Sequence, residues 1–465
     1  MRVRVPSCSS FALLILLALA QLANASDWPR FRGPNGSGVS PDDQPTPSTW
    51  TDTENVKWSV DLPGPGSSCP IVVGDKVFVT CWTGYGLSRD EPGDQSQLKR
   101  HLICFDRNTG KTLWDRAVDP YLPEDNYGGM FAEHGYTSHT PVSDGERVFA
   151  FFGKTGVVAF DMDGKELWKV SVGTASDPRN WGSASSPILY KNLIIVPAAV
   201  ENHALVALNK ETGKEEWKQE AQGFEGTWGS PILADAGDGT QKIVCAVPGE
   251  LWAFDPDNKG KLAWFVTDLG GDSCSTSAIT TDGIVYLVGG RDGQTVAVKA
   301  DGKGDVTATN IKWSENMQGG IGTPVLHDGK IYSISRDVVT CIDAAMGEEV
   351  FKKRLEAPVE ETKEETAEAA PPAEAQGEGG RGGRRGGRGG GFMNQSYASP
   401  VIADGKLYFM TRAGLCYVFT LGEELEQVAT NKFGSDEADF SATPAISDGE
   451  IFIRSSKKLY CVAAK

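Results

Sequence analysis

The sequence lacks the short motifs that most directly indicate catalysis or metal binding. It contains no GxSxG, no HExxH and no glycine-rich phosphate-binding loop, so the common signatures of serine hydrolases, zinc peptidases and nucleotide-binding enzymes are absent. There is no CxxCH for covalent haem and no CxxC pair for zinc. No two of its nine cysteines are adjacent. The chain therefore has to be interpreted from its organisation.

Basic residues are also in deficit. The chain has 45 Lys and Arg residues against 62 Asp and Glu residues, for a net charge of −17. This balance disfavours a general surface for nucleic acid or for anionic membranes, because both attract basic proteins. We therefore expect no nucleic-acid partner.

Long apolar runs are confined to the N-terminus. Arg2 and Arg4 precede an apolar run at residues 11–20, and Ala23-Asn24-Ala25 fits a signal-peptidase site. The run is too short to span a bilayer as a mature helix. We predict a signal peptide at residues 1–25 and a protein without a transmembrane segment that is exported to the periplasm or beyond the cell.

What the chain has in abundance is a repeat. The phrase GVVAFDMDGKELW, Gly156–Trp168, reads as a strand, an Asp-Gly turn and a second strand that carries Trp. Similar phrases end at Trp114, Trp217, Trp264 and Phe351. Each unit opens on a small residue that is usually followed by Pro. The openings are Cys69-Pro70, Thr140-Pro141, Ser186-Pro187, Ser230-Pro231, Ser277-Ala278, Thr323-Pro324, Ser399-Pro400 and Thr443-Pro444.

Four short strands can be placed in each unit. Eight units of four antiparallel strands predict an all-β fold, an eight-bladed β-propeller over residues 54–465. The eighth unit ends after its third strand, and residues 54–61, which carry Trp58, can supply the fourth. We therefore predict a ring closed by an N-terminal strand, preceded by an N-terminal extension at residues 26–53. The recurring Trp should wedge between neighbouring blades.

The cysteines favour burial over a dense disulfide framework. We align Cys104, Cys341, Cys416 and Cys461 at one repeat position, where the other units carry Ala159, Ala207, Ala253 and Ala297. A position that alternates between Cys and Ala requires a small buried residue. Cys69 and Cys81 flank the first hairpin and could pair across it, whereas the states of Cys245 and Cys274 stay open.

Three insertions interrupt the repeat, and one of them, Thr83–Arg100, could help to form a lid on the same face as the loop Asp119–His139. Residues 352–391 are rich in Glu, Ala and Pro and then in Arg and Gly, which predicts a disordered loop between blades six and seven, a solvated linker rather than an RNA-binding tract. The loop Asp119–His139 could build a metal site, but its Glu-His-x4-His spacing favours a surface loop folded over the ring. Its possible ligands are Asp125, Glu133, His134 and His139.

At Cys104–Trp114 and Ala207–Trp217 the units resemble the pyrroloquinoline-quinone (PQQ) repeat family. The stretch Asp27–Ser40 is similar to the leader of exported propellers in that family. The family includes quinoprotein alcohol dehydrogenases and the non-catalytic assembly factor of the BamB type. Both resemblances imply an exported eight-bladed ring.

The resemblance implies two different activities. In the dehydrogenases PQQ is bound with Ca²⁺, an Asp base and a disulfide between adjacent cysteines, and no adjacent cysteines occur here. The BamB type is a lipoprotein, and this signal has no lipid-accepting Cys. Our leading hypothesis is a monomeric, non-catalytic binding or scaffolding module for a protein partner or a small anionic ligand. The alternative is a PQQ-dependent oxidoreductase that acts on alcohols or sugars, with calcium.

Candidate binding residues lie in the segments before each first strand and in the turns between second and third strands, which share the funnel face of a propeller. The aromatic candidates are Tyr136, His139, Trp181, Trp228 and Tyr397. The cationic candidates are Lys154, Arg291, Arg336, Arg412 and Arg454. They could line a funnel for a flat or anionic ligand, or they could simply cover the ring core and occupy solvated turns.

Overall fold

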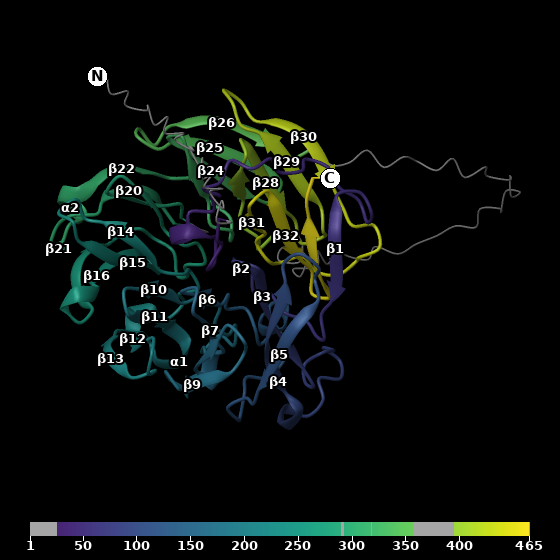
Figure 1. Cartoon of the computed structure of the whole chain (residues 1–465). Coiled ribbons are helices and arrows are strands. Elements are labelled where there is room, and N and C mark those ends of the chain that lie inside the picture. The colour runs from purple at the N-terminus through teal and green to yellow at the C-terminus, as the bar shows by residue number, and fades with distance from the viewer. Residues whose placement is uncertain (1–25, 290–292, 318, 357–394, 465) are drawn as a thin grey trace, which may run out of the picture.

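A computed structural model describes residues 26–289, 293–317, 319–356 and 395–464. In this part of the chain, eight antiparallel sheets follow one another around a ring (Figure 1). The eight-bladed, all-β propeller predicted from the repeat is confirmed. The predicted signal peptide at residues 1–25 lies outside the described residues. None of the helices in the described ranges has the length and apolarity needed to cross a bilayer.

The first four blades use consecutive strands. Blade 1 contains β2 (Ile71–Val73), β3 (Lys76–Thr83), β4 (Lys99–Asp106) and β5 (Thr112–Val118). Blade 2 contains β6 (Val142–Ser143), β7 (Arg147–Phe151), β8 (Val157–Asp161) and β9 (Glu166–Val170). Blade 3 contains β10 (Ile188–Tyr190), β11 (Leu193–Ala198), β12 (Ala204–Asn209) and β13 (Glu215–Glu220). Blade 4 contains β14 (Ile232–Asp235), β15 (Gln241–Val247), β16 (Glu250–Asp255) and β17 (Lys261–Val266).

The second half of the ring repeats this order. Blade 5 contains β18 (Ile279–Thr281), β19 (Ile284–Leu287), β20 (Thr295–Lys299) and β22 (Ile311–Glu315). Blade 6 contains β23 (Val325–His327), β24 (Lys330–Ser335), β25 (Val338–Asp343) and β26 (Glu349–Arg354). Blade 7 contains β27 (Val401–Ala403), β28 (Lys406–Met410), β29 (Cys416–Thr420) and β30 (Glu426–Asn431). Blade 8 contains β31 (Ala445–Ser447), β32 (Glu450–Arg454), β33 (Lys458–Val462) and β1 (Val56–Asp61).

Short helical turns occupy some of the connections. The helices are α1 (Ala199–Asn202) and α2 (Thr307–Asn310), and the 3-10 turns are η1 (Pro34–Gly36), η2 (Gln95–Gln97), η3 (Phe131–Glu133), η4 (Gly153–Thr155), η5 (Gln222–Phe224) and η6 (Pro256–Asn258). The connection that carries α2 also adds β21 (Gly304–Asp305), which pairs in parallel with β17 of blade 4. The repeat pattern did not predict this fifth strand.

The small residues that open the units form a closed ring of hydrogen bonds. In every blade the backbone N–H of the opening residue donates to the side chain of the opening residue in the next blade. The pairs are Cys69 to Thr140, Thr140 to Ser186, Ser186 to Ser230, Ser230 to Ser277, Ser277 to Thr323, Thr323 to Ser399, Ser399 to Thr443 and Thr443 to Cys69, at 2.9–3.2 Å. Seven hydroxyls and one thiol therefore link all eight blades, and we call this set the hydroxyl ring.

A second set of contacts joins the outer strands. The Trp of one blade packs on the Gly of the turn between third and fourth strands in the next blade, as Trp168 does on Gly213. Its indole N–H usually donates to a carbonyl oxygen of that turn, at 3.2 Å from Trp168 to Lys210. The same packing joins Trp58 to Gly110, Trp114 to Gly164, Trp217 to Gly260 and Trp313 to Gly347. The wedge predicted for the recurring Trp is confirmed.

The predicted closure of the ring is also confirmed. Strand β1 pairs antiparallel with β33, and Trp58 lies opposite Cys461. The eighth blade is therefore built from both end regions of the described chain, and β1 covers the edge that β33 would otherwise expose. In Figure 1, β1 lies beside the last strands in yellow.

Two expectations about the cysteines need correction. Val418, not Cys416, is the residue of β29 that faces the outer strand at the Cys/Ala position, because it pairs with Ala429 as Cys104 pairs with Trp114. The pairing considered for Cys69 and Cys81 is absent. All eight cysteines in the described part of the chain are buried and unpaired, and Cys69 Sγ belongs to the hydroxyl ring.

The boundary of the long insertion also needs correction. Residues 352–354, placed at its start by composition, belong to β26, where Lys352 pairs with Thr340. Lys352, Lys353 and Arg354 therefore belong to the last strand of blade 6 and not to the insertion. Residues 357–394, which hold most of the predicted disordered loop, lie outside the described residues.

Replacing Ser186 with Ala should destabilise the ring. The change removes the acceptor for the buried N–H of Thr140 while leaving the bond from Ser186 N–H to Ser230 in place. An unsatisfied buried donor costs about 1–3 kcal/mol. Ser186→Thr, which copies the residue of three other blades, should retain most of the stability. Equal urea midpoints for the Ala and Thr variants would contradict the role assigned to the hydroxyl.

The Trp–Gly contact can be tested against a matched glycine. Gly213 has φ of +71° and a Cβ added there would lie 2.7 Å from Trp168, whereas Gly329 has φ of +72° and open space. Gly329→Ala should cost roughly 1 kcal/mol from backbone strain alone. Gly213→Ala should cost a further ~1–3 kcal/mol because the indole must move. Chemical denaturation of both variants measures the difference, and equal losses would show that the indole contact is unimportant.

Candidate functional site

Two insertions fold together over the funnel face on blade 1. Residues 84–98 and 119–139 are joined by Gln95, whose side chain donates to the Glu124 carbonyl at 3.1 Å and accepts from the Glu124 N–H at 3.2 Å. Below this contact lies a buried cluster of Trp82, Tyr85, Leu98, Phe131 and Tyr136. The loop predicted to fold over the ring does so, and it is held by aromatic packing.

We call the two insertions, residues 84–98 and 119–139, the lid. Tyr136 belongs to its core. It is 3% exposed, its ring lies 4.8 Å from that of Phe131, and its hydroxyl donates to the Asp125 carbonyl at 2.7 Å. Burial raises the pKa of Tyr136, so the phenol stays neutral. The residue therefore covers the ring core, which was the simpler of the two interpretations of its sequence position.

Buried ion pairs lie beneath the lid. Arg100 and Glu124, both with side chains 3% exposed, pair at 2.6 Å. The ammonium of Lys154 donates to Asp125 and to Ser176, each at 2.7 Å. Since its charge is already matched by Asp125, Lys154 holds η4 to the lid rather than presenting a free cation to the funnel.

A second buried polar group joins blades 2 and 3. His139 Nε2 lies 3.0 Å from Ser183 Oγ, and that hydroxyl donates to Glu201 Oε1 in α1. His139 is 4% exposed and Glu201 is 3% exposed. His139 Nδ1 and Glu201 Oε2 have no hydrogen-bond partner. We call these three residues the polar trio.

Burial shifts the pKa values of two members of the polar trio toward their neutral forms. Desolvation lowers the pKa of His139 to about 3, with the positive charge of Arg100 and the nearby His134 acting in the same direction. Desolvation raises the pKa of Glu201 to about 7, partly opposed by the hydrogen bond from Ser183. Ser183 lies between His139 and Glu201 in this series of hydrogen bonds. In a hydrolytic triad the histidine lies between the serine and the acid, so the order differs.

An aromatic pair lies between blades 3 and 4. The rings of Trp181 and Trp228 are 5.3 Å apart at 35°, and both are only partly buried. The guanidinium of Arg179 lies 5.3 Å from one ring and 5.6 Å from the other. Trp228 Nε1 donates to the Gly182 carbonyl at 2.7 Å. We call Arg179, Trp181 and Trp228 the tryptophan platform.

The predicted cations do not form one open arc. Arg412 lies over the ring of Tyr397 at 5.4 Å and is paired with Asp439 and, at 2.5 Å, with Glu133 of the lid. Arg454 is 1% exposed, because its guanidinium points into the protein towards Ser68 and Thr80. Arg336 is exposed, and Arg291 lies outside the described residues. A binding role for these residues stays a prediction.

The structure brings together some candidates and adds residues that the sequence did not suggest. Trp181 and Trp228 meet, and His139 contacts the same segment through Ser183. Arg179, Ser183 and Glu201 were missed. Glu201 carried a signal, because it is the one acidic residue between the apolar runs of β11 and β12. Ser183 and Arg179 carried none, because only the fold places them beside their partners.

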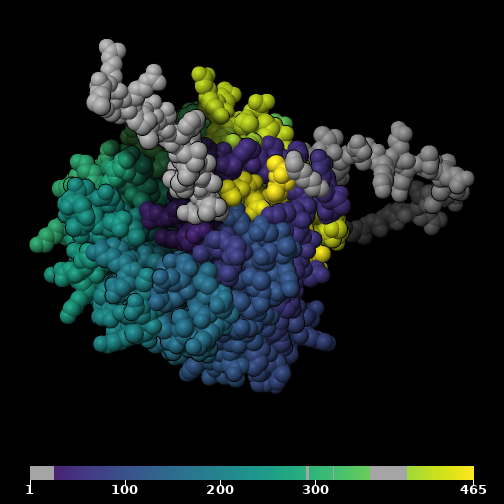
Figure 2. Space-filling model, viewed as in Figure 1, coloured from purple at the N-terminus to yellow at the C-terminus, as the bar shows by residue number. Residues whose placement is uncertain are grey.

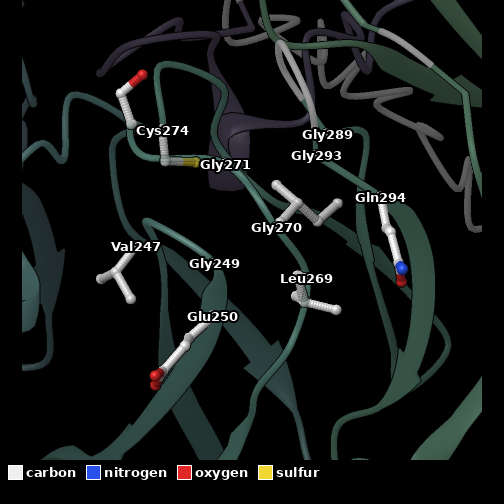
Figure 3. A pocket seen from close by; sticks show the side chains of 12 residues that line it. Val247, Gly249, Glu250, Leu269, Gly270, Gly271, Cys274, Gly289, Gly293 and Gln294 are labelled. Atoms are coloured by element: carbon white, nitrogen blue, oxygen red, sulfur yellow. The ribbon is translucent and has the colours of Figure 1, made fainter.

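A small cavity opens on the same face between blades 4 and 5. It is lined mainly by turn residues, among them Gly249, Leu269, Gly270, Cys274 and Gln294 (Figure 3). Its volume is about 20 Å³, room for a water molecule but far below the ~300 Å³ of a typical ligand pocket. This cavity is therefore too small for an organic ligand.

The described ranges of the chain contain no group of three or more His, Cys, Asp or Glu side chains placed to hold a metal ion. The four residues considered in the lid have separate partners. Asp125 pairs with Lys154, Glu133 with Arg89 and Arg412, His134 with Ser138 and the Trp181 carbonyl, and His139 with Ser183.

Comparison with known proteins agrees with this geometry. The family model described as "Outer membrane protein assembly factor BamB" matches residues 32–176 and 155–312, more than half of the 465-residue chain. A polyvinylalcohol dehydrogenase of Pseudomonas sp is 27% identical over 297 residues, which cover 45% of this chain and 46% of that protein. The match thus spans about half the length of this relative.

Solved structures show the same fold. BamB from Moraxella catarrhalis superposes with a TM-score of 0.55 and 11% identity, over 88% of this chain and 97% of that chain. A quinohemoprotein alcohol dehydrogenase from Comamonas testosteroni superposes with a TM-score of 0.61 and 12% identity, over 96% and 82%. At such identities the likeness demonstrates the fold alone.

The polar trio predicts a specific pH dependence. Because folding raises the pKa of Glu201 from 4.5 to about 7, the folded chain holds a proton that the unfolded chain releases between these values. Wild-type stability should therefore fall as pH rises from 4.5 through 7 on account of this group. Glu201→Gln removes the effect, so its stability relative to wild type should increase by roughly 1–3 kcal/mol between pH 5 and pH 8.

Denaturation midpoints at both pH values measure this difference. The exposed Glu216→Gln serves as the matched control and should track wild type. A constant gap between Glu201→Gln and wild type across the pH range would mean that Glu201 does not titrate there.

Proposed function

The chain belongs to the family whose model is described as outer membrane protein assembly factor BamB, and on this premise we propose that it is an exported, non-catalytic propeller that acts as a binding module. Its funnel face binds a protein partner or a small ligand, and the chain acts as a monomer. The tryptophan platform is the observation that carries this proposal.

The tryptophan platform has the properties of a binding anchor. Trp and Arg are enriched among the residues that dominate binding energy, because they bury a large area and retain polar contacts. Trp181 and Trp228 are partly exposed although they have few rotamers to lose. Arg179 Nη2 donates to the Asp272 carbonyl at 3.2 Å, which fixes the guanidinium over both rings. A partner side chain or a flat ligand would thus meet a preorganised surface.

The lid supports a binding role in a second way. Three of its acidic side chains are paired within the protein, since Arg100 pairs with Glu124, Lys154 with Asp125 and Arg412 with Glu133. These pairs fix the lid against blades 1, 2 and 7. A rim that is fixed to the blades beside a partly exposed aromatic surface suits recognition by shape.

The family implies PQQ with calcium, and the described residues do not fit this pair. Calcium requires several converging oxygen ligands, and the described chain offers no cluster of three carboxylates or other metal-binding side chains. PQQ carries three carboxylates, yet Lys154 and Arg412 are already paired with acids of the protein. No redox step is therefore derived for this chain.

The alternative function is a PQQ-dependent oxidoreductase, and two observations favour it. The similarity to a polyvinylalcohol dehydrogenase extends over 297 residues. Glu201 is a buried carboxyl group with an unpartnered oxygen beside the funnel. Purified protein titrated with PQQ and Ca²⁺ separates the two functions. Saturable binding followed by dye reduction with alcohols, sugars or polyvinyl alcohol would replace our proposal with this one.

Trp181→Ala with Trp228→Ala should strongly weaken partner binding. Proteins of the exported fraction would be captured on the immobilised chain and quantified by mass spectrometry. Loss of a hot spot of about 2 kcal/mol predicts roughly 30-fold less of any specific partner. Leu262→Ala, on the outer strand β17 and 40% exposed, is the control and should retain the partner. Equal capture by the control and by the double variant would exclude the platform as the binding surface.

A further inference from the structure

The N-terminal extension enters the centre of the ring. Its backbone pairs with the first strands of several blades, because Trp28 forms a bridge with Val72, the Ser143 N–H donates to the Pro29 carbonyl, and Val39 forms a bridge with Ile402. Figures 1 and 2 show this segment in purple at the middle of the ring. The predicted extension at residues 26–53 therefore includes a plug, which we define as residues 26–40.

Two arginines of the plug are buried near the ring axis. Arg30 is 7% exposed and Arg32 is 1% exposed. Arg30 Nη2 donates to the Pro231 carbonyl at 2.9 Å, and Arg32 Nη2 donates to the Pro324 carbonyl at 2.7 Å. These bonds cross to blades 4 and 6. We call Arg30 and Arg32 the channel arginines.

The channel arginines have unused donors and no counter-charge. Arg30 Nε, Arg32 Nε and Arg32 Nη1 are buried without a hydrogen-bond partner. None of the ion pairs found among the described residues includes Arg30 or Arg32. The other buried charges of the described residues differ from one another in this respect, because Arg100 is paired with Glu124, whereas Arg454 has no ion pair and an unpartnered Nη2.

Leaving these charges uncompensated would be costly. An isolated buried charge is disfavoured by several kcal/mol, and two like charges close together add to that. Burial lowers the pKa of Arg30 to about 10 and that of Arg32 to about 9, so both remain protonated at neutral pH. The Cys69 thiol is near Arg32, but burial raises its pKa, so it stays neutral and does not supply the missing negative charge.

The hydroxyl ring surrounds this position. Pro231 and Pro324, which accept from the channel arginines, directly follow Ser230 and Thr323 of the ring. The hydroxyls of Ser230 and Thr323 accept backbone N–H groups, and their own hydrogens remain as donors. Positive charge and hydroxyl donors at one place form an environment that favours an anion.

The size of the anion is limited by the plug itself. A Cβ on Gly38 would lie 2.4 Å from Arg32 Nη2, and one on Gly36 would lie 3.3 Å from Arg30 Nη2. The backbone thus packs directly on the guanidinium groups, which excludes a large anion from their side.

We propose that the channel arginines and the hydroxyl ring hold a small inorganic anion of the size of chloride, which couples the plug to the blades. The ion compensates the two guanidinium charges, so the plug is seated only when the anion is bound. The site is independent of the tryptophan platform and of any function of the funnel face.

Bromide provides a direct test on the wild-type chain. Crystals soaked in bromide should show an anomalous peak within hydrogen-bonding distance of Arg32 Nε or Nη1, or of Arg30 Nε. A peak elsewhere only, or density that refines as water with no anomalous signal at these atoms, would overturn the proposal. This measurement needs no variant and therefore does not depend on whether a substituted chain folds.

A second test uses stability in solution. At constant ionic strength, the Tm of the wild type should rise by at least about 2 °C when gluconate is replaced with 100 mM chloride, because only chloride fits the site. Arg32→Met should abolish this difference. Arg354→Met, an exposed arginine on β26, is the matched control and should retain it. The same Tm in chloride and gluconate for the wild type, or a chloride effect that persists in Arg32→Met, would count against the site.

Discussion

The hydroxyl ring is the interaction on which the rest of this structure depends. In each blade one backbone N–H donates to a small side chain of the next blade, and the bond from Thr443 to Cys69 closes the ring. A hydrogen bond of this kind satisfies a donor that would otherwise be buried without a partner. The position tolerates Ser, Thr or Cys because only a short acceptor fits there. The inner ends of blades that differ in sequence are therefore joined in the same way. The Trp–Gly contacts join the outer strands of neighbouring blades.

A rigid ring allows the connections to differ. The two insertions on blade 1 are long, yet they are held by Gln95, by aromatic packing and by ion pairs that reach blades 2 and 7. The resulting lid neutralises two of the cations that a linear alignment places at equivalent turns, Lys154 and Arg412. What stays partly exposed beside it is the tryptophan platform, where two blades contribute one ring each. Binding on this face thus depends on which side chains the lid leaves exposed.

The channel arginines show a second consequence of the ring. A propeller has a central channel that must be filled, and here the plug fills it with residues that precede the first blade. Its Arg side chains reach the carbonyl groups just after the hydroxyl ring, in blades 4 and 6. Three features therefore stabilise the ring: the plug fills its channel, β1 completes its last blade, and the hydroxyl ring links neighbouring blades.

The sequence alone determined the number of blades, their strands and the closure by residues 54–61, because turn residues and alternating strands are local patterns that repeat. It also indicated the openings of the units, although not that their side chains bond to one another. The partners of Lys154, Arg412 and Arg454, the polar trio and the tryptophan platform were decided by the tertiary structure. These contacts join residues from different blades or insertions, and no local pattern specifies which side chains meet across a closed ring. Cys416 illustrates the same limit, because only the strand pairing shows that Val418, two residues further along, occupies the position that the sequence alignment assigns to cysteine.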